Sequence, residues 1–304
     1  MRVEEQARGQ GILPPGARVA IASVAIAALL PYLVLKVLWL SGSEIGMVPG
    51  SGPGHMQDTR MEIGNIITVV LTVIGVVVVL ALTQPWGRRL PWWTLVVPAA
   101  AGTGALAPIA LGLPIGATLQ VATEGSTRSG GEGNLSGSVF AVVYGGFGVF
   151  GIALAILFAD YVHRRWAALI STAPAPLRPP WARTLATAAV VLFAAVMIFW
   201  ALARAPHGLA GWESLAQRVV LVVVALLALL GAAALLTPTG GPGLRWLTAW
   251  VGCTTAAVQG PLLLLLAHDA TINPYLLAVT ILATPAAAFL WLAAVHQTSR
   301  AGMT

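Results

Sequence analysis

The single lysine of this 304-residue chain lies inside an apolar stretch, where a charged side chain is unusual. Lys36 belongs to ALLPYLVLKVLWL and follows Pro31 by about one helical turn. Intramembrane charges usually face the interior of a helix bundle, and an ammonium group there can bind an anion or relay a proton. Two structural alternatives are exposure at the outer lipid headgroups and an ion pair with Glu44, Asp58 or Glu62. Lys36 is therefore a candidate substrate-binding residue.

Glu62 and Asn65 lie one turn apart at the start of the second apolar stretch. A carboxylate at a helix N-terminus is stabilised by the helix dipole, which is a structural explanation for Glu62. The functional hypothesis is that both residues contact a substrate together with Lys36.

Polar side chains also occur in the middle of the third and seventh apolar stretches. Thr103 lies in AAAGTGAL, while Thr254, Thr255 and Gln259 lie in VGCTTAAVQG. Such groups often form hydrogen bonds between membrane helices. Contact with a substrate is the alternative, so all four remain candidate binding residues.

Acid–base and metal chemistry have weaker support in the sequence. His268 and Asp269 follow the seventh stretch and are candidates for an acid and a base at the outer surface. His55, His207 and His268 fall in outer connections beside carboxylates, a mixture that can bind zinc. No HExxH spacing supports a metal site, and no P-loop, nucleophile elbow or CxxC motif occurs. The sequence therefore predicts no metal or cofactor and assigns no catalytic residue.

Eight long apolar stretches must position these residues. Charged residues make up 9 % of the chain and hydrophobic residues 58 %, whereas soluble domains contain about 25 % charged residues. A membrane-spanning helix needs about 20 apolar residues and satisfies its backbone within the segment. We therefore predict an all-α polytopic membrane protein. Its eight transmembrane helices are expected at 18–40, 62–83, 92–118, 137–160, 183–204, 217–237, 245–267 and 274–296.

The arginines predict the orientation of these helices. Eleven arginines fall in connections or tails on one side and four on the other, so the positive-inside rule places both termini in the cytoplasm. The basic pI of about 10.4 is thus a membrane feature, and no nucleic-acid partner is expected. The chain divides into a tail at 1–17, helices one to four at 18–160, a cytoplasmic linker at 161–182, helices five to eight at 183–296 and a tail at 297–304.

An internal similarity favours a tandem four-plus-four repeat. A shift of 154 residues aligns ALTQPWGRRLPWWT with LLTPTGGPGLRWLT and pairs Trp92 with Trp246. The alternative is a chance likeness between two turns. If the repeat is real, the two halves superpose about an axis near the membrane normal.

The repeat would make the third and seventh helices corresponding elements. Both contain Gly and Pro near mid-membrane, at Pro98, Pro108 and Pro114 in one and at Gly260 and Pro261 in the other. A pair of interrupted helices is a sequence indication of a midplane binding site. The alternative is a packing kink relieved by neighbouring helices.

The segment PYLVLKVLWLSG, with Pro31, Tyr32, Lys36, Trp39 and Gly42, resembles uncharacterised multi-pass membrane proteins of GC-rich actinobacteria. The resemblance covers about a tenth of the chain and implies no activity. The excess of arginine over lysine also suggests a GC-rich bacterial genome. We therefore expect a location in the bacterial cytoplasmic membrane.

These observations favour a transporter-like protein that handles a small molecule or ion at a site between the first, second, third and seventh helices. An intramembrane enzyme acting on a lipid or isoprenoid, and a structural subunit of a membrane complex, are the alternatives. A transporter needs polar residues that reach toward both faces along one path, whereas an enzyme needs carboxylates gathered in one pocket. The expected partners are membrane lipids and a small hydrophobic or ionic ligand.

Overall fold

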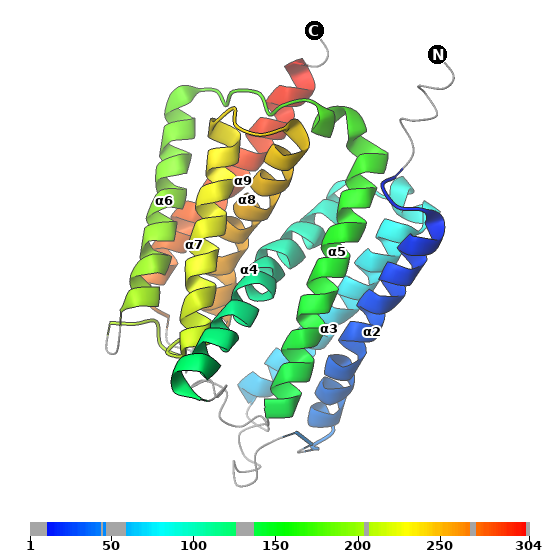
Figure 1. The fold of residues 1–304 in the computed structure, drawn as a ribbon, viewed down its shortest axis with the longest axis vertical. Helices are drawn as coiled ribbons and strands as arrows, with labels where there is room; N and C mark the ends of the chain where they lie inside the picture. Colours follow the sequence, from blue (N-terminus) through cyan, green and yellow to red (C-terminus); the bar gives the residue numbers. More distant parts are fainter. Residues whose placement is uncertain are drawn as a thin grey trace. The chain divides into compact units, whose positions relative to one another are not determined.

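The computed structural model describes residues 11–43, 45–46, 59–125, 137–203, 207–267 and 272–301, and these contain helices but no strand. Within these described ranges, eight helices are long and apolar enough to cross a membrane, so the predicted all-α polytopic class is confirmed. They are α2 (Pro15–Leu40), α3 (Thr59–Thr83), α4 (Trp93–Glu124), α5 (Gly137–Ser171), α6 (Pro180–Leu202), α7 (Leu215–Leu236), α8 (Pro242–Leu265) and α9 (Pro274–Ala301) (Figure 1).

Two helices extend well beyond their predicted ends, because polar side chains that seemed to mark helix ends have partners inside the protein. Helix α4 continues to Glu124, and its Gln120 is buried and accepts a hydrogen bond from the backbone of Ala216 at 3.0 Å. Helix α5 continues past Asp160 to Ser171. Much of the predicted linker at 161–182 is therefore helical, with a local departure from helical geometry at Trp166 (φ −133°, ψ 36°).

The chain forms two compact units. The N-terminal unit comprises the described residues of Gly9–Gly102 and Thr127–Arg165, and the C-terminal unit comprises those of Thr103–Ser126 and Trp166–Thr304. Helix α4 changes unit after Gly102, and α5 changes unit at the distorted residue Trp166.

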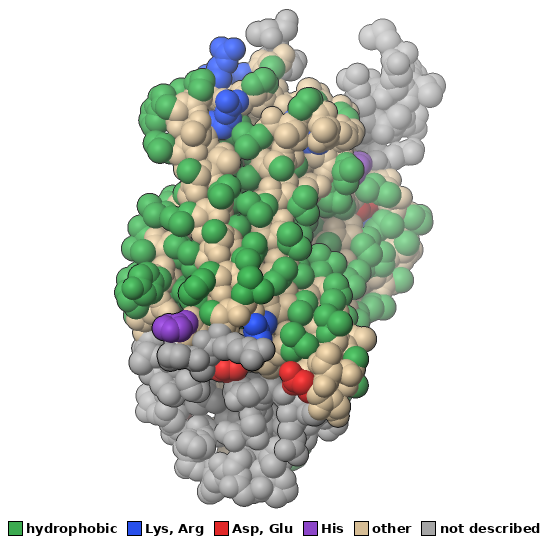
Figure 2. All heavy atoms as spheres, turned by 60° about the vertical axis from the view of Figure 1, so that its left-hand side comes forward, with side chains coloured by type: hydrophobic (Ala, Val, Ile, Leu, Met, Phe, Trp, Pro, Cys, Tyr) green, Lys and Arg blue, Asp and Glu red, His purple; other side chains and the backbone are tan. Residues whose placement is uncertain are grey.

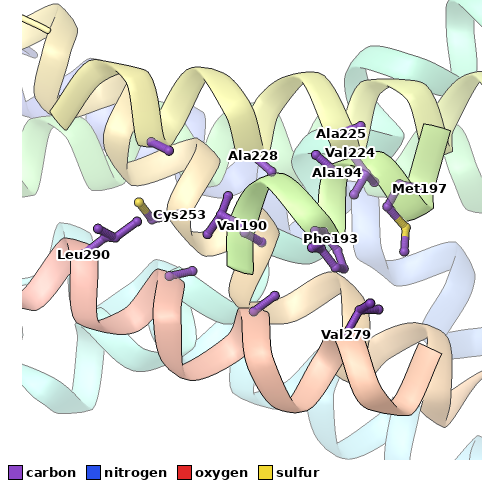
Figure 3. Close-up of a cluster of buried hydrophobic side chains, with 14 of the residues drawn as sticks. Val190, Phe193, Ala194, Met197, Val224, Ala225, Ala228, Cys253, Val279 and Leu290 are labelled. Atoms are coloured by element: carbon purple, nitrogen blue, oxygen red, sulfur yellow. The ribbon is translucent and has the colours of Figure 1, made fainter. Parts of the chain in front are cut away.

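In the C-terminal unit, α6 to α9 form a closed four-helix bundle. Helix α6 packs against α7 and α9, and α8 packs against the same two helices (Figure 1). The side chains between them are apolar and mostly small. They include Val190, Phe193, Ala194, Met197, Val224, Ala225, Ala228, Cys253, Val279 and Leu290 (Figure 3).

Small residues allow the backbones of this bundle to approach closely, which is the usual basis of helix association in membranes. The clearest case joins α7 and α8, where a Cβ placed on Gly231 would lie 2.6 Å from Cα of Gly252. Helix α4 approaches α7 in the same way, since a Cβ on Gly116 would lie 2.7 Å from Cα of Ala216. Larger residues at these glycines would force the helices apart.

The N-terminal unit packs α2, α3, α5 and the first part of α4 together. Helix α2 packs on α3, and its Tyr32 makes an edge-to-face contact with Phe147 of α5 at 4.7 Å between ring centroids. Gly75 of α3 faces the ring of Phe150 on α5, and Gly102 of α4 faces Leu154. A short 3-10 turn, η2 (Pro85–Arg89), connects α3 to α4.

The outer surface fits a lipid environment. On the face drawn in Figure 2, hydrophobic side chains cover the middle, and charged or histidine side chains lie toward the two ends. Leu, Val and Ile side chains are widely exposed along the helices. In water such a surface would be costly, because monomeric soluble proteins rarely expose large contiguous apolar patches.

Candidate functional site

Lys36 points into the N-terminal unit and not along lipid to the surface. Its Nζ donates to Oδ1 of Asn65 at 2.7 Å, and the Asn65 side chain is buried. The ammonium also lies 5.2 Å from the ring centroid of Tyr32 and 4.9 Å from that of Trp39. We call Lys36, Asn65, Tyr32 and Trp39 the Lys36 cluster. Lys36 therefore faces Asn65, as the functional hypothesis for this lysine requires. Its role as a substrate-binding residue stays a prediction.

The C-terminal end of α2 holds the Lys36 cluster in place. Trp39 is buried, and its Nε1 donates to the backbone carbonyl of Ile45 at 3.0 Å. This bond ties the backbone of Ile45 to the last turn of α2. The indole therefore serves both as a face for the ammonium and as an anchor for the segment that follows.

A line of polar side chains continues from Asn65 along α3. Thr68 and Thr72 follow at spacings of three and four residues, which places all three on one helix face. The Thr68 hydroxyl donates to the carbonyl of Asn65 at 2.9 Å, and the Thr72 hydroxyl donates to that of Thr68 at 2.8 Å. Asn65 and Thr72 are buried. Polar groups therefore run from the start of α3 to its middle.

Glu62 has a different environment from the rest of this line. It is exposed in the first turn of α3, where the helix dipole favours a carboxylate. Among the described side chains, Lys36 bonds to Asn65 and is not paired with Glu62. Glu44 and Asp58, the other two predicted ion-pair partners of Lys36, lie outside the described residues. The structural explanation for Glu62 therefore needs no ligand.

A second polar cluster, which the sequence analysis did not propose, surrounds Asp160 at the other end of the N-terminal unit. Asp160 is fully buried. Its carboxylate accepts from the backbone of Leu13 and from Nε of Arg164, both at 2.9 Å, and lies 3.6 Å from Nε of Arg18. Arg164 also donates to the carbonyl of Leu82 at 2.7 Å. We call Asp160, Arg164 and Arg18 the Asp160 cluster.

The Asp160 cluster joins three parts of the chain. Leu13 lies just before α2 and Arg18 near its start, while Leu82 lies in the last turn of α3 and Asp160 in α5. The last carbonyls of a helix have no partner within it, and a cation there is also favoured by the helix dipole. Arg164 meets both conditions at the end of α3, so the cluster is explained as a structural clamp.

In the C-terminal unit, the side chain of Gln259 donates hydrogen bonds to the backbone of α4. Its Nε2 donates to the carbonyl of Gly104 at 2.7 Å and lies 3.3 Å from that of Ala105, both in α4. Gly104 lies four residues before Pro108, and proline has no N–H to donate to that carbonyl. Gln259 thus supplies the hydrogen bond that Pro108 removes.

Helices α8 and α9 show the same arrangement, in which a side chain of one helix bonds to a carbonyl that a proline leaves open in the other. Pro261 in α8 leaves the carbonyl of Ala257 without its usual donor. The hydroxyl of Thr284, in α9, donates to this oxygen at 2.9 Å. Side chains from neighbouring helices therefore satisfy the gap in α4 and the gap in α8.

These contacts change the interpretation of the two proline-containing helices. We expected interrupted helices beside a midplane site. Instead, α4 and α8 run without a break from Trp93 to Glu124 and from Pro242 to Leu265. The carbonyls at Gly104 and Ala257 have protein donors, so the packing explanation accounts for them without a bound ligand.

The threonine candidates are buried or partly buried in the same region. Thr103 accepts from Nε1 of Trp250 at 3.2 Å, and Thr254 donates to the carbonyl of Trp250 at 2.7 Å within its own helix. Thr255 is fully buried, and its hydroxyl has no hydrogen-bond partner among the described residues. The hydroxyl of Thr280 on α9 is also buried without a hydrogen-bond partner among the described residues.

Several outer-face candidates fall outside the described residues: His55, His268 and Asp269. His207 is described and exposed. Across the described ranges, no three His, Cys, Asp or Glu side chains gather in a way that could hold a metal ion.

The candidate residues therefore form two separate groups, each within one unit. Lys36 and Asn65 meet in the N-terminal unit; Thr103, Thr254 and Gln259 contribute to the packing of α4 against α8 in the C-terminal unit. Comparison with protein-family models, curated proteins and solved structures finds no match to the chain.

Proposed function

We propose that the protein is a transporter-like membrane protein that binds a small anionic solute at the Lys36 cluster. The observation that carries the proposal is the position of the Lys36 ammonium, which lies inside the helix packing against a buried amide and two aromatic rings. An intramembrane cation is costly and commonly marks a pathway for substrate or ions. Gln259 and Thr254 are excluded from the proposed site, because backbone groups already occupy them.

The chemistry of the cluster suits an anion. The Lys36 ammonium is positively charged and donates to the amide oxygen of Asn65. A carboxylate or phosphate oxygen would form a charge-assisted hydrogen bond with such an ammonium group. The polar face of Asn65, Thr68 and Thr72 offers further hydrogen-bonding groups toward the middle of α3. This line gives the solute a route inward from the end of the helix.

The test is flux through the purified protein reconstituted in phosphatidylcholine vesicles. Concentration jumps of acetate, glutamate, phosphate and chloride are applied, and charge movement or tracer uptake is recorded. We expect at least one anion to give a signal above protein-free vesicles. Lys36→Met should reduce it by at least about tenfold, the equivalent of one charge-assisted hydrogen bond, while Lys36→Arg retains part of it because the charge remains.

A second variant separates a binding role from a packing role. Asn65→Asp would place a fixed carboxylate 2.7 Å from the ammonium position, where it competes with an external anion. We expect this variant to remain folded and to lose anion flux. Ser23→Ala on α2, whose hydroxyl bonds only to its own helix, is the matched control. Normal flux in Lys36→Met, or no flux of any probe in the wild type, would refute the proposal; anion binding without flux would favour an enzyme or receptor.

A further inference from the structure

The turn between α3 and α4 presents basic and aromatic side chains on its outside. Arg88 and Arg89 are exposed and form no ion pair with a described carboxylate. Three indoles accompany them, with Trp86, Trp92 and Trp93 exposed by 42, 50 and 57 %. Because indoles favour the membrane–water interface, these side chains bear on what the turn contacts there.

The backbone of this turn is fixed without help from those side chains. Gly87 is buried, and a Cβ at this position would collide with the backbone carbonyl of Ala81. Further on, the carbonyl of Leu90 accepts from both terminal nitrogens of Arg165, at 3.3 and 3.2 Å. The turn is therefore a stable base from which the arginines and tryptophans project.

The sequence-related turn between α7 and α8 shows that outward-facing Arg and Trp are not required by such a turn. The 154-residue shift places Pro242 and Gly243 at the positions of Arg88 and Arg89. The arginine and tryptophan that follow this second turn, at the start of α8, face inward. Arg245 is buried and donates to the carbonyl of Ala234 at 3.0 Å, and Trp246 is 3 % exposed and donates to that of Thr172 at 2.9 Å.

We propose that the exposed side chains of the α3–α4 turn bind the headgroup of an anionic phospholipid. Both flanking helices are long and apolar enough to cross a membrane, so the turn lies at a membrane surface. Indoles favour this interface, and guanidinium groups bind phosphate through paired hydrogen bonds. Two adjacent arginines flanked by three tryptophans thus match a phosphate attached to acyl chains better than a free phosphate, which offers no apolar part to the indoles.

Native mass spectrometry of the full-length protein in detergent tests this proposal. Phosphatidylglycerol and phosphatidylcholine with identical acyl chains are titrated separately. We expect the wild type to bind phosphatidylglycerol more tightly, and the double variant Arg88→Gln/Arg89→Gln to bind it about 10- to 30-fold more weakly, since each basic residue near an anionic surface contributes about a factor of five. Binding of phosphatidylcholine should not change.

The matched control is Arg183→Gln/Arg300→Gln, which removes two charges at the ends of α6 and α9 and should lower phosphatidylglycerol affinity less than about threefold. If the double variant does not fold, the single variants Arg88→Gln and Arg89→Gln should each weaken binding about fivefold. Equal affinity of the wild type for both lipids, or equal weakening in the control, would overturn the proposal. Displacement of the lipid by glycerol 3-phosphate at similar concentration would identify a soluble phosphate ligand instead.

Discussion

Two regions of this protein satisfy backbone carbonyls that a helix leaves open, and they use different chemistry. At one end of the N-terminal unit, Arg164 binds the carbonyl of Leu82, and Asp160 holds the arginine in place. In the middle of the C-terminal unit, Gln259 and Thr284 bind the carbonyls of Gly104 and Ala257. A charged side chain thus donates to an open carbonyl at a helix end, whereas neutral side chains donate to open carbonyls inside helices.

The difference follows from the cost of charge at depth. Near a helix end, an arginine can be compensated by a carboxylate and by the negative end of the helix dipole. In the middle of a membrane span an ion is far more expensive than an amide or hydroxyl. Removing one member of a buried ion pair should therefore lower stability more than removing a neutral hydrogen-bond donor. The reason is that the other ion of the pair stays buried without compensation.

The largest expected effect is at Asp160. Asp160→Asn removes the carboxylate that compensates Arg164 and Arg18, and we expect it to lower the free energy of unfolding by about 3–5 kcal/mol. Denaturant titration in detergent micelles measures this change. Glu124→Gln, which alters an exposed carboxylate at the end of α4, should cost less than about 0.5 kcal/mol. Equal stability of the two variants would show that the Asp160 cluster is not a clamp.

The next effect is at Gln259. Gln259→Leu leaves the carbonyl of Gly104 without its side-chain donor and should cost about 1–3 kcal/mol. Pro108→Ala restores a backbone N–H four residues after Gly104, so the loss from Gln259→Leu should become smaller in that background. A double-mutant cycle measures this coupling. Additive effects of the two changes would mean that Gln259 does not compensate for the proline.

The smallest effect distinguishes two threonines. Thr284→Val removes the donor to the carbonyl of Ala257 and should cost about 0.6 kcal/mol, the average for a hydrogen bond between membrane helices. Thr255→Val removes a buried hydroxyl without a partner, so stability should stay the same or rise. The same unfolding titration applies to both. A loss at Thr255 as large as that at Thr284 would reveal a bonding partner for its hydroxyl.

The features that depend on residues close together in the chain could be predicted from the sequence. Each apolar run of sufficient length became a helix, and the two polar residues at the facing ends of α2 and α3, Lys36 and Asn65, are in contact. Consecutive antiparallel helices bring such ends together, so this pair was accessible from the order of the helices alone.

Long-range partners were not predictable in this way. Asp160 marked a helix end in the sequence, because nothing nearby showed that Leu13, 147 residues away, would contact it. Pro108 and Pro261 indicated breaks for the same reason, since their compensating donors lie on other helices. The sequence shows which carbonyl each proline leaves without a backbone donor, because that carbonyl lies four residues earlier. It does not show which side chain of another helix donates to that carbonyl. The four-plus-four superposition stays a prediction.

The bond between Gln259 and Gly104 also has a consequence for how the protein is made. Gly104 is synthesised 155 residues before the side chain that completes its hydrogen bonding. During that interval α4 enters the membrane with an open carbonyl in its interior, and hydrocarbon offers no donor. Helix α4 therefore reaches its final bonded state only after α8 has been inserted, so the order of translation leaves an early helix dependent on a late one.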